Sequence, residues 1–230
     1  MFFDPLYMIM LLPALVLAGI ASLITQTTFS KYSRISASSG LTGAEAASRL
    51  LERKGVHDVH VERINGFLSD HYDPRTHTLR LSAKVYDSDS LSAIGVACHE
   101  AGHALQHASH YAPLSLRSAL VPVTQIGTIA PYLIIPLGFI LGSLSLIKLG
   151  IALFAIVVLF SLITLPVEWN ASARAKELMV SSGIVSAREQ ESAGKVLNAA
   201  FLTYIAAAVS ALLTLLYYLI RSGLLGGRRD

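Results

Sequence analysis

Two histidines and a glutamate occur at the spacing of a zinc-hydrolase helix in residues 96–107, VACHEAGHALQH. Residues four apart lie on one face of an α-helix, so His99 and His103 can reach the same ion. Glu100 points to the side, where a carboxylate can take the proton of a water whose pKa zinc lowers toward ~7. The short motif also occurs on surface helices with two solvated histidines. It predicts half of a catalytic site, which needs three protein ligands.

The third ligand must come from elsewhere in the chain. A metzincin would have glycine three residues and histidine six residues after His103, where this chain has Gln106 and Ser109. His107 lies roughly 12 Å along the helix from the first histidine, too far to share its ion. A site-2-type intramembrane protease would use an aspartate from a later span, but residues 90–229 contain none. Only downstream glutamates remain.

Four downstream glutamates are candidates: Glu168, Glu177, Glu189 and Glu191. Glu168 is distinctive because it ends an uncharged apolar run, two residues after Leu165-Pro166, at the expected membrane edge. Two membrane spans between His103 and Glu168 would return the chain to the side that it left, so the ligands can meet. The alternative for Glu168 is an ordinary carboxylate at the membrane interface.

Long apolar runs must position these groups. The chain of 230 residues is 53% hydrophobic and 14% charged, whereas a soluble domain carries roughly a quarter charged residues. Each run reaches the ~20 residues that a spanning helix needs. The four runs are residues 6–27, 119–147, 149–167 and 199–220. The second contains Pro122, Pro131 and Pro136, so we expect it to kink or to begin late.

The polar region after the first run predicts a small α+β domain. Thr42 and Glu45 predict a capping box that opens a helix ending at Gly55. Alternating, β-branched residues at 56–64 and 76–86 predict strands, separated by a turn at 73–75. A helix is then expected around the HEAGH sequence. We expect an N-terminal anchor at 1–27, a catalytic domain at 28–118, a transmembrane hairpin at 119–167, a helical segment with a break near Ser181–Gly183 at 168–198, and a final transmembrane helix and tail at 199–230.

The charges favour one orientation and exclude other kinds of partner. Lys31 and Arg34 follow the first run, which places the catalytic domain in the cytoplasm by the positive-inside rule. Arg221, Arg228 and Arg229 would then lie outside, against the rule. Net charge is only +3, and without a dense basic patch we expect no nucleic-acid partner.

The two motifs together resemble those of a known family. HEAGH with the distant EWNASARA resembles the gluzincin arrangement of membrane zinc peptidases such as the HtpX-like and CAAX-prenyl proteases. Over nearly its whole length the chain resembles more closely the bacterial neutral zinc metallopeptidases of the YugP-like family. The matching stretches are residues 66–106 and 165–175, with the flanking spans.

The resemblance implies a zincin-like fold and one Zn²⁺ ion. By position it makes His99, His103 and Glu168 the zinc ligands and Glu100 the general base. The family usually has Phe-Asp after the third ligand, where this chain has Trp169-Asn170. Asn170 can orient a neighbour by hydrogen bonding but supplies no negative charge.

Substrate-binding or oxyanion-stabilising groups have several candidates. The strand TLRLS, residues 78–82 with Leu79 and Leu81, is either an edge strand that pairs with an extended peptide or an ordinary core strand. The polar side chains to consider are His71, Tyr72, Arg75 and Arg174, each of which can equally be a solvated surface residue. We expect Cys98, the single cysteine, to be a packing residue.

Together these features predict an α-helical integral membrane protein of about four spans with a small α+β zincin-like metalloprotease domain. The expected function is zinc-dependent endopeptidase cleavage of membrane-associated or misfolded polypeptides at the cytoplasmic face of a bacterial inner membrane. One alternative is a non-catalytic zinc-binding membrane scaffold or chaperone. A channel or transporter is disfavoured because the runs contain almost no charged residues.

Overall fold

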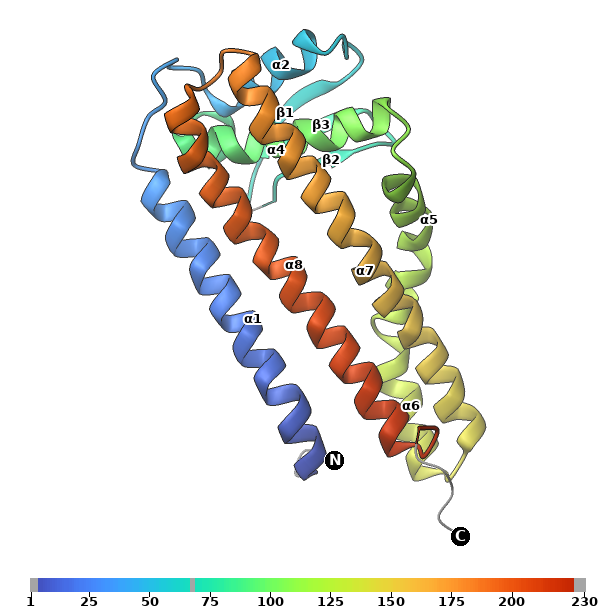
Figure 1. The fold of residues 1–230 in the computed structure, drawn as a ribbon. Coiled ribbons are helices and arrows are strands. Elements are labelled where there is room, and N and C mark those ends of the chain that lie inside the picture. The colour runs from blue at the N-terminus through green and yellow to red at the C-terminus, as the bar shows by residue number, and fades with distance from the viewer. Residues whose placement is uncertain (1–3, 67–68, 226–230) are drawn as a thin grey trace. The chain divides into compact units, whose positions relative to one another are not determined.

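The computed structural model describes residues 4–66 and 69–225 (Figure 1). Arg228 and Arg229, which bear on the expected orientation, lie outside these residues. The chain forms two compact units. The first comprises residues 1–21, 116–165 and 203–230, and the second comprises residues 22–115 and 166–202. Helices α1 (Pro5–Tyr32), α7 (Leu144–Ser181) and α8 (Ala187–Arg221) contribute residues to both units.

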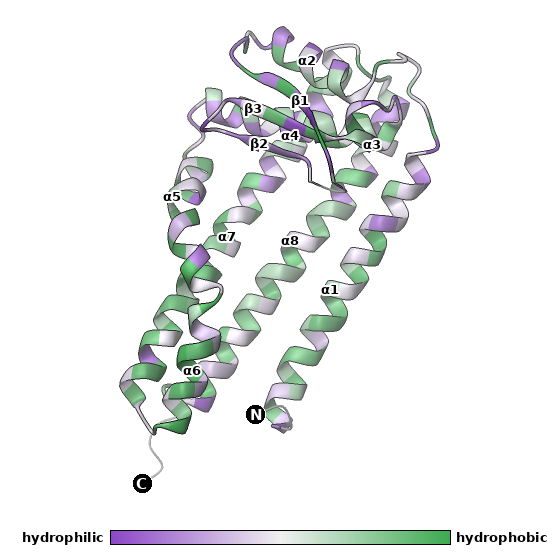
Figure 2. Cartoon of the chain, turned by 180° about the vertical axis from the view of Figure 1, so that it is seen from behind, coloured by the Kyte–Doolittle hydropathy of each residue, from purple (hydrophilic) through white to green (hydrophobic). Residues whose placement is uncertain are grey.

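The apolar helices include three or four candidate membrane spans, as a membrane protein would have. α1, α7 and α8 are each long and apolar enough to cross a bilayer. Figure 2 shows hydrophobic residues along most of their length, whereas the strands carry many polar residues. In the first unit, Tyr217 is fully buried and its hydroxyl lies 3.1 Å from Asp4 Oδ2, which ties α8 to the beginning of the chain.

The expected kink lies in the proline-containing run. α5 (Ala112–Gly127) and α6 (Ala130–Ile140) are bent by 42° at a short break and make a fourth span if the pair is counted as one. Pro131 lies in the first turn of α6, where a missing N–H costs no helical hydrogen bond. α7 and α8 are separated at Ser182–Ser186, where Gly183 adopts φ +65°, close to the break expected from sequence.

The second unit contains the α+β fold. α2 (Gly43–Arg53) begins with the predicted capping box, because the Thr42 side chain accepts from the Glu45 N–H and the Glu45 carboxylate accepts from the Thr42 N–H. α3 (Ala83–Tyr86) is a short helix where the sequence predicted continued strand. α4 (Leu91–Ala108) is the HEAGH helix.

Three strands form a sheet in the order β1-β3-β2 (Figure 1). β1 (His60–Ile64) pairs parallel with β3 (Thr78–Ser82), and β2 (His71–Asp73) pairs antiparallel with β3 on its other side. β2 was not predicted, because three residues carry too little alternation to be recognised.

Of the two alternatives for TLRLS, the edge strand is therefore wrong. β3 is the central strand, and its backbone pairs on both sides, so it offers no free edge to a peptide. Leu79 and Leu81 are fully buried and belong to the core. The alternative, an ordinary core strand, describes this segment.

The core of the second unit joins helices that lie far apart in sequence. Side chains of α2, α3, β3, α4 and the ends of α7 and α8 pack in one hydrophobic cluster. Small residues line α4 within it, including Ala97, Ala101 and Ala104, all nearly or fully buried. They allow neighbouring elements to approach the helix closely, which positions the groups described next.

Candidate metal centre

Helix α4 carries the two histidines of the centre. The Ser90 side chain accepts a hydrogen bond from the Ala93 N–H and caps the start of the helix. His99 and His103 lie on one face, with ring centroids 4.8 Å apart and the rings nearly perpendicular. Their side chains are only 13% and 10% exposed. Both imidazoles therefore face the same shielded space.

Glu168 on α7 meets both histidines. Its Oε2 atom lies 3.2 Å from His99 Nε2 and 3.5 Å from His103 Nε2, and the carboxylate is almost fully buried. The approach of α7 to α4 depends on Gly102, because a Cβ there would lie 2.7 Å from the Ala171 carbonyl oxygen. One residue's lack of a side chain thus brings the carboxylate within reach of the helix.

The donor set fits a zinc ion. Each of the three residues offers one ligand atom, and these atoms lie within 4.8 Å of one another. Tetrahedral zinc with bonds of ~2.0–2.1 Å separates its ligand atoms by ~3.3 Å, close to the 3.2 and 3.5 Å between Glu168 Oε2 and the two imidazole nitrogens. Two imidazole nitrogens and one carboxylate oxygen are a ligand set found in catalytic zinc sites, with a fourth position left open.

Glu100 lies beside this set without belonging to it. It follows His99 in sequence and is 9% exposed. Burial lowers the pKa of the His103 imidazole, but the hydrogen bond and charge of Glu168, together with the charge of Glu100, raise it more. The net effect is a pKa above the ordinary value of histidine, to which the Glu100 charge contributes.

A chain of hydrogen bonds holds His103 in one orientation. Gln106, fully buried on the next turn of α4, accepts from His103 Nδ1 through its Oε1 atom at 3.0 Å. The Gln106 amide nitrogen donates to the Val167 carbonyl at 2.8 Å and to Asn170 Oδ1 at 3.0 Å. Arg174 Nε donates to the same Asn170 oxygen at 2.9 Å.

The donors and acceptors in this series of hydrogen bonds follow from the groups at its two ends. Arg174 can only donate and the Val167 carbonyl can only accept, so Asn170 presents its oxygen and Gln106 its amide nitrogen to them. Gln106 then has only its oxygen left for His103, which must carry its proton on Nδ1. In the neutral imidazole, His103 Nε2 then carries no proton, and its lone pair is available to a metal ion.

Asn170 was the sequence candidate for orienting a ligand by hydrogen bonding. The structure instead places Asn170 one step away, in contact with Gln106 and not with a candidate ligand. Ser172 contacts the other histidine, with its Oγ 3.1 Å from His99 Nδ1. Gln106 and Ser172 were both missed. Helical spacing was the available signal, because Gln106 follows His103 by three residues and Ser172 follows Glu168 by four.

Three of the substrate-binding or oxyanion candidates have surroundings away from the candidate metal ligands. His71 Nδ1 lies 2.8 Å from the Ser69 carbonyl, and Arg75 is exposed in the turn after β2. The Tyr72 hydroxyl lies 2.9 Å from His107 Nδ1, and burial together with nearby aspartates raises the pKa of Tyr72 to about 12. These contacts give none of the three a direct link to the candidate ligands.

Arg174 and Cys98 also have defined surroundings. Arg174 donates to Asn170 and to the Leu105 carbonyl, and its guanidinium lies over the Tyr111 ring. Its hydrogen bonds therefore support the centre. Cys98 is fully buried in the core, and burial raises the pKa of its thiol to about 12, as befits a packing residue.

Comparisons with known proteins identify the family of the chain. Residues 7–223 match the family described as "Putative neutral zinc metallopeptidase". The chain is 49% identical over 214 residues to the "Putative membrane protease YugP" of Bacillus subtilis (strain 168), covering 93% of this chain and 95% of that protein. No solved structure gives a significant match. The match along nearly the whole length shows that this chain belongs to this neutral zinc metallopeptidase family.

Proposed function

We propose that this protein is a zinc-dependent endopeptidase of the membrane, with His99, His103 and Glu168 as the ligands of one Zn²⁺ ion. The observation that carries the proposal is the convergence of two imidazole Nε2 atoms on one buried carboxylate at 3.2 and 3.5 Å. A buried carboxylate is costly unless a cation or hydrogen bonds compensate it. Family membership supports zinc as that cation.

Zinc, when bound, supplies Lewis acidity toward water and a peptide carbonyl. The chain's own groups do the rest. Glu100 accepts a proton at its carboxylate and later delivers it to the leaving amine, as a general acid–base residue does. Gln106 and Ser172 hold the two imidazoles in place. The reaction therefore needs little free energy to reorganise the site.

We further propose that the substrate is an extended segment of a membrane-associated or misfolded polypeptide. Because both sides of β3 are paired, an added strand would have to pair with β1 or β2. We favour β2, because its Tyr72 contacts His107 on the helix that carries the candidate ligands. The domain is proposed to face the cytoplasm, supported by Lys31 in the last turn of α1 and Arg34 just after that helix.

The deciding experiment measures zinc content and proteolysis of the purified full chain in detergent. Glu100→Gln is expected to keep stoichiometric zinc and lose at least about 99% of peptide cleavage, in line with the 10²–10⁴-fold of general acid–base catalysis. Glu168→Gln is expected to lose both zinc and cleavage. Glu177→Gln removes an exposed carboxylate from the same helix and serves as the matched control.

Two outcomes would contradict the proposal. Cleavage that survives Glu100→Gln would refute the catalytic role of that residue. Full zinc occupancy with normal activity in Glu168→Gln would refute the ligand assignment. Zinc binding without cleavage in the wild type, together with an unchanged cellular phenotype in Glu100→Gln, would favour the non-catalytic scaffold instead.

A further inference from the structure

A groove between α1 and α8 lies outside the candidate metal centre. It has a volume of about 420 Å³, within the range of ligand-binding pockets. The residues lining it are Ile24, Thr28, Lys31, Tyr32, Lys195, Asn198, Ala199 and Leu202. The Thr25 hydroxyl donates to the Ala199 carbonyl at 2.9 Å, which holds the two helices together at this position.

The groove changes from cationic to apolar along its length. Lys31 lies seven residues after Ile24 on α1, and Lys195 lies seven residues before Leu202 on α8. Seven helical residues span roughly 10 Å. Because the two helices run in opposite directions (Figure 1), both lysines belong to one end of the groove and both apolar residues to the other.

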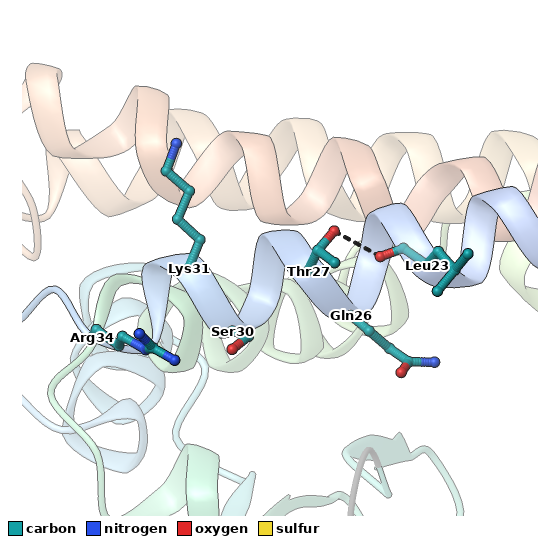
Figure 3. A pocket seen from close by; sticks show the side chains of 6 residues that line it. All are labelled: Leu23, Gln26, Thr27, Ser30, Lys31 and Arg34. Carbon is teal, nitrogen blue, oxygen red and sulfur yellow. Dashed lines mark hydrogen bonds between the residues drawn. The ribbon is translucent and has the colours of Figure 1, made fainter.

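The cationic end is not neutralised by the protein. No acidic residue lines the groove, and neither lysine forms an ion pair in the described part of the chain. Figure 3 shows Lys31 directed to the opposite side of α1 from Gln26 and Ser30. A third cation lies nearby, because Lys176 Nζ donates to Asn198 Oδ1 at 3.1 Å. Because this contact uses the Asn198 oxygen, the amide nitrogen is the Asn198 atom that can donate to a ligand.

From these observations we infer that the groove binds one anionic phospholipid. The phosphodiester takes the end formed by Lys31, Lys195 and Asn198, and the acyl chains lie along Ile24 and Leu202. The groove is graded from charge to hydrocarbon, as such a lipid is, and it lies on two candidate membrane spans. A free phosphate matches only the cationic end and gains nothing from the apolar one.

Interfacial lysines also occur without a bound lipid, because they extend their ammonium groups toward water. The two explanations differ in lipid selectivity. If the two lysines only extend toward water, Lys31 and Lys195 should not distinguish an anionic headgroup from a zwitterionic one. A phospholipid site predicts that they do, by roughly fivefold in affinity for each lysine near the surface.

The test uses the full chain in detergent, with thermal unfolding followed during separate titrations with phosphatidylglycerol, phosphatidylcholine and inorganic phosphate. Phosphatidylglycerol is expected to raise the unfolding temperature more than phosphatidylcholine, and inorganic phosphate is expected to leave it unchanged. Lys31→Gln/Lys195→Gln is expected to weaken phosphatidylglycerol binding roughly 25-fold. Arg53→Gln/Lys54→Gln removes the same charge from the end of α2 and should retain the preference.

Equal stabilisation of the wild type by both lipids would overturn the proposal, and so would an undiminished preference in the lysine double variant. A response to inorganic phosphate equal to that of phosphatidylglycerol would show an anion site rather than a lipid site, which also overturns it. Lys31→Arg/Lys195→Arg keeps both charges and should behave as wild type, so a fold defect in the glutamine variant cannot imitate the expected result.

Discussion

Gln106→Leu tests the hydrogen-bond chain that orients His103. Leucine fills nearly the same volume but has no amide. The substitution leaves the His103 Nδ1–H without its acceptor and removes one donor from the Val167 carbonyl, both in a buried environment. An unsatisfied buried polar group costs about 1–3 kcal/mol.

We expect the metal-free protein to lose about 2–3 kcal/mol of unfolding free energy, because Asn170 keeps Arg174 as a partner and the Val167 carbonyl remains within a helix. Zinc affinity should fall further than stability alone explains. Loss of a partner that orients a metal-binding histidine typically weakens metal binding 10- to 100-fold.

The assay is zinc affinity by competition with a chelator, at a temperature where both variants are folded. Gln26→Leu, an exposed glutamine on α1, is the matched control and should bind zinc as the wild type does. A folded Gln106→Leu protein with wild-type zinc affinity would refute the orienting role. Weaker zinc binding in Gln26→Leu as well would assign the effect to a general loss of stability.

Other perturbations test the elements around the centre. Gly102→Ala should weaken zinc binding and lower the unfolding temperature, because the new Cβ would press on the Ala171 carbonyl oxygen; zinc titration of the folded variant at wild-type affinity would contradict this. Thr42→Ala should cost about 1 kcal/mol in denaturant unfolding by removing the cap of α2, and no loss would contradict the capping box. The pKa of Asp73 is lowered to about 2, first by the Arg75 N–H. Its stabilising contribution is present above the ordinary pKa and is lost as pH falls from about 4 to about 2, so stability should fall more steeply in wild type than in Asp73→Asn, and parallel profiles would contradict this.

The membrane class and half of the centre could be predicted from sequence because both depend on local periodicity. Four residues along a helix always return to the same face, so the HEAGH spacing by itself placed His99 and His103 together. Apolar runs of sufficient length likewise predict spans without any tertiary contact. Glu168 could be selected by elimination and resemblance, but its distances to the histidines depend on the close approach of Gly102 to Ala171.

Tertiary structure alone decided the order of the strands and the neighbours of each ligand. A central and an edge strand can share one sequence pattern, because which backbone groups remain unpaired depends on strands distant in sequence. The roles of Asn170 and Arg174 changed for the same reason. The contact of Gln106 with His103 lies within α4 and follows from helical spacing, whereas only the packing of α7 against α4 determined that Asn170 contacts Gln106 and not His103.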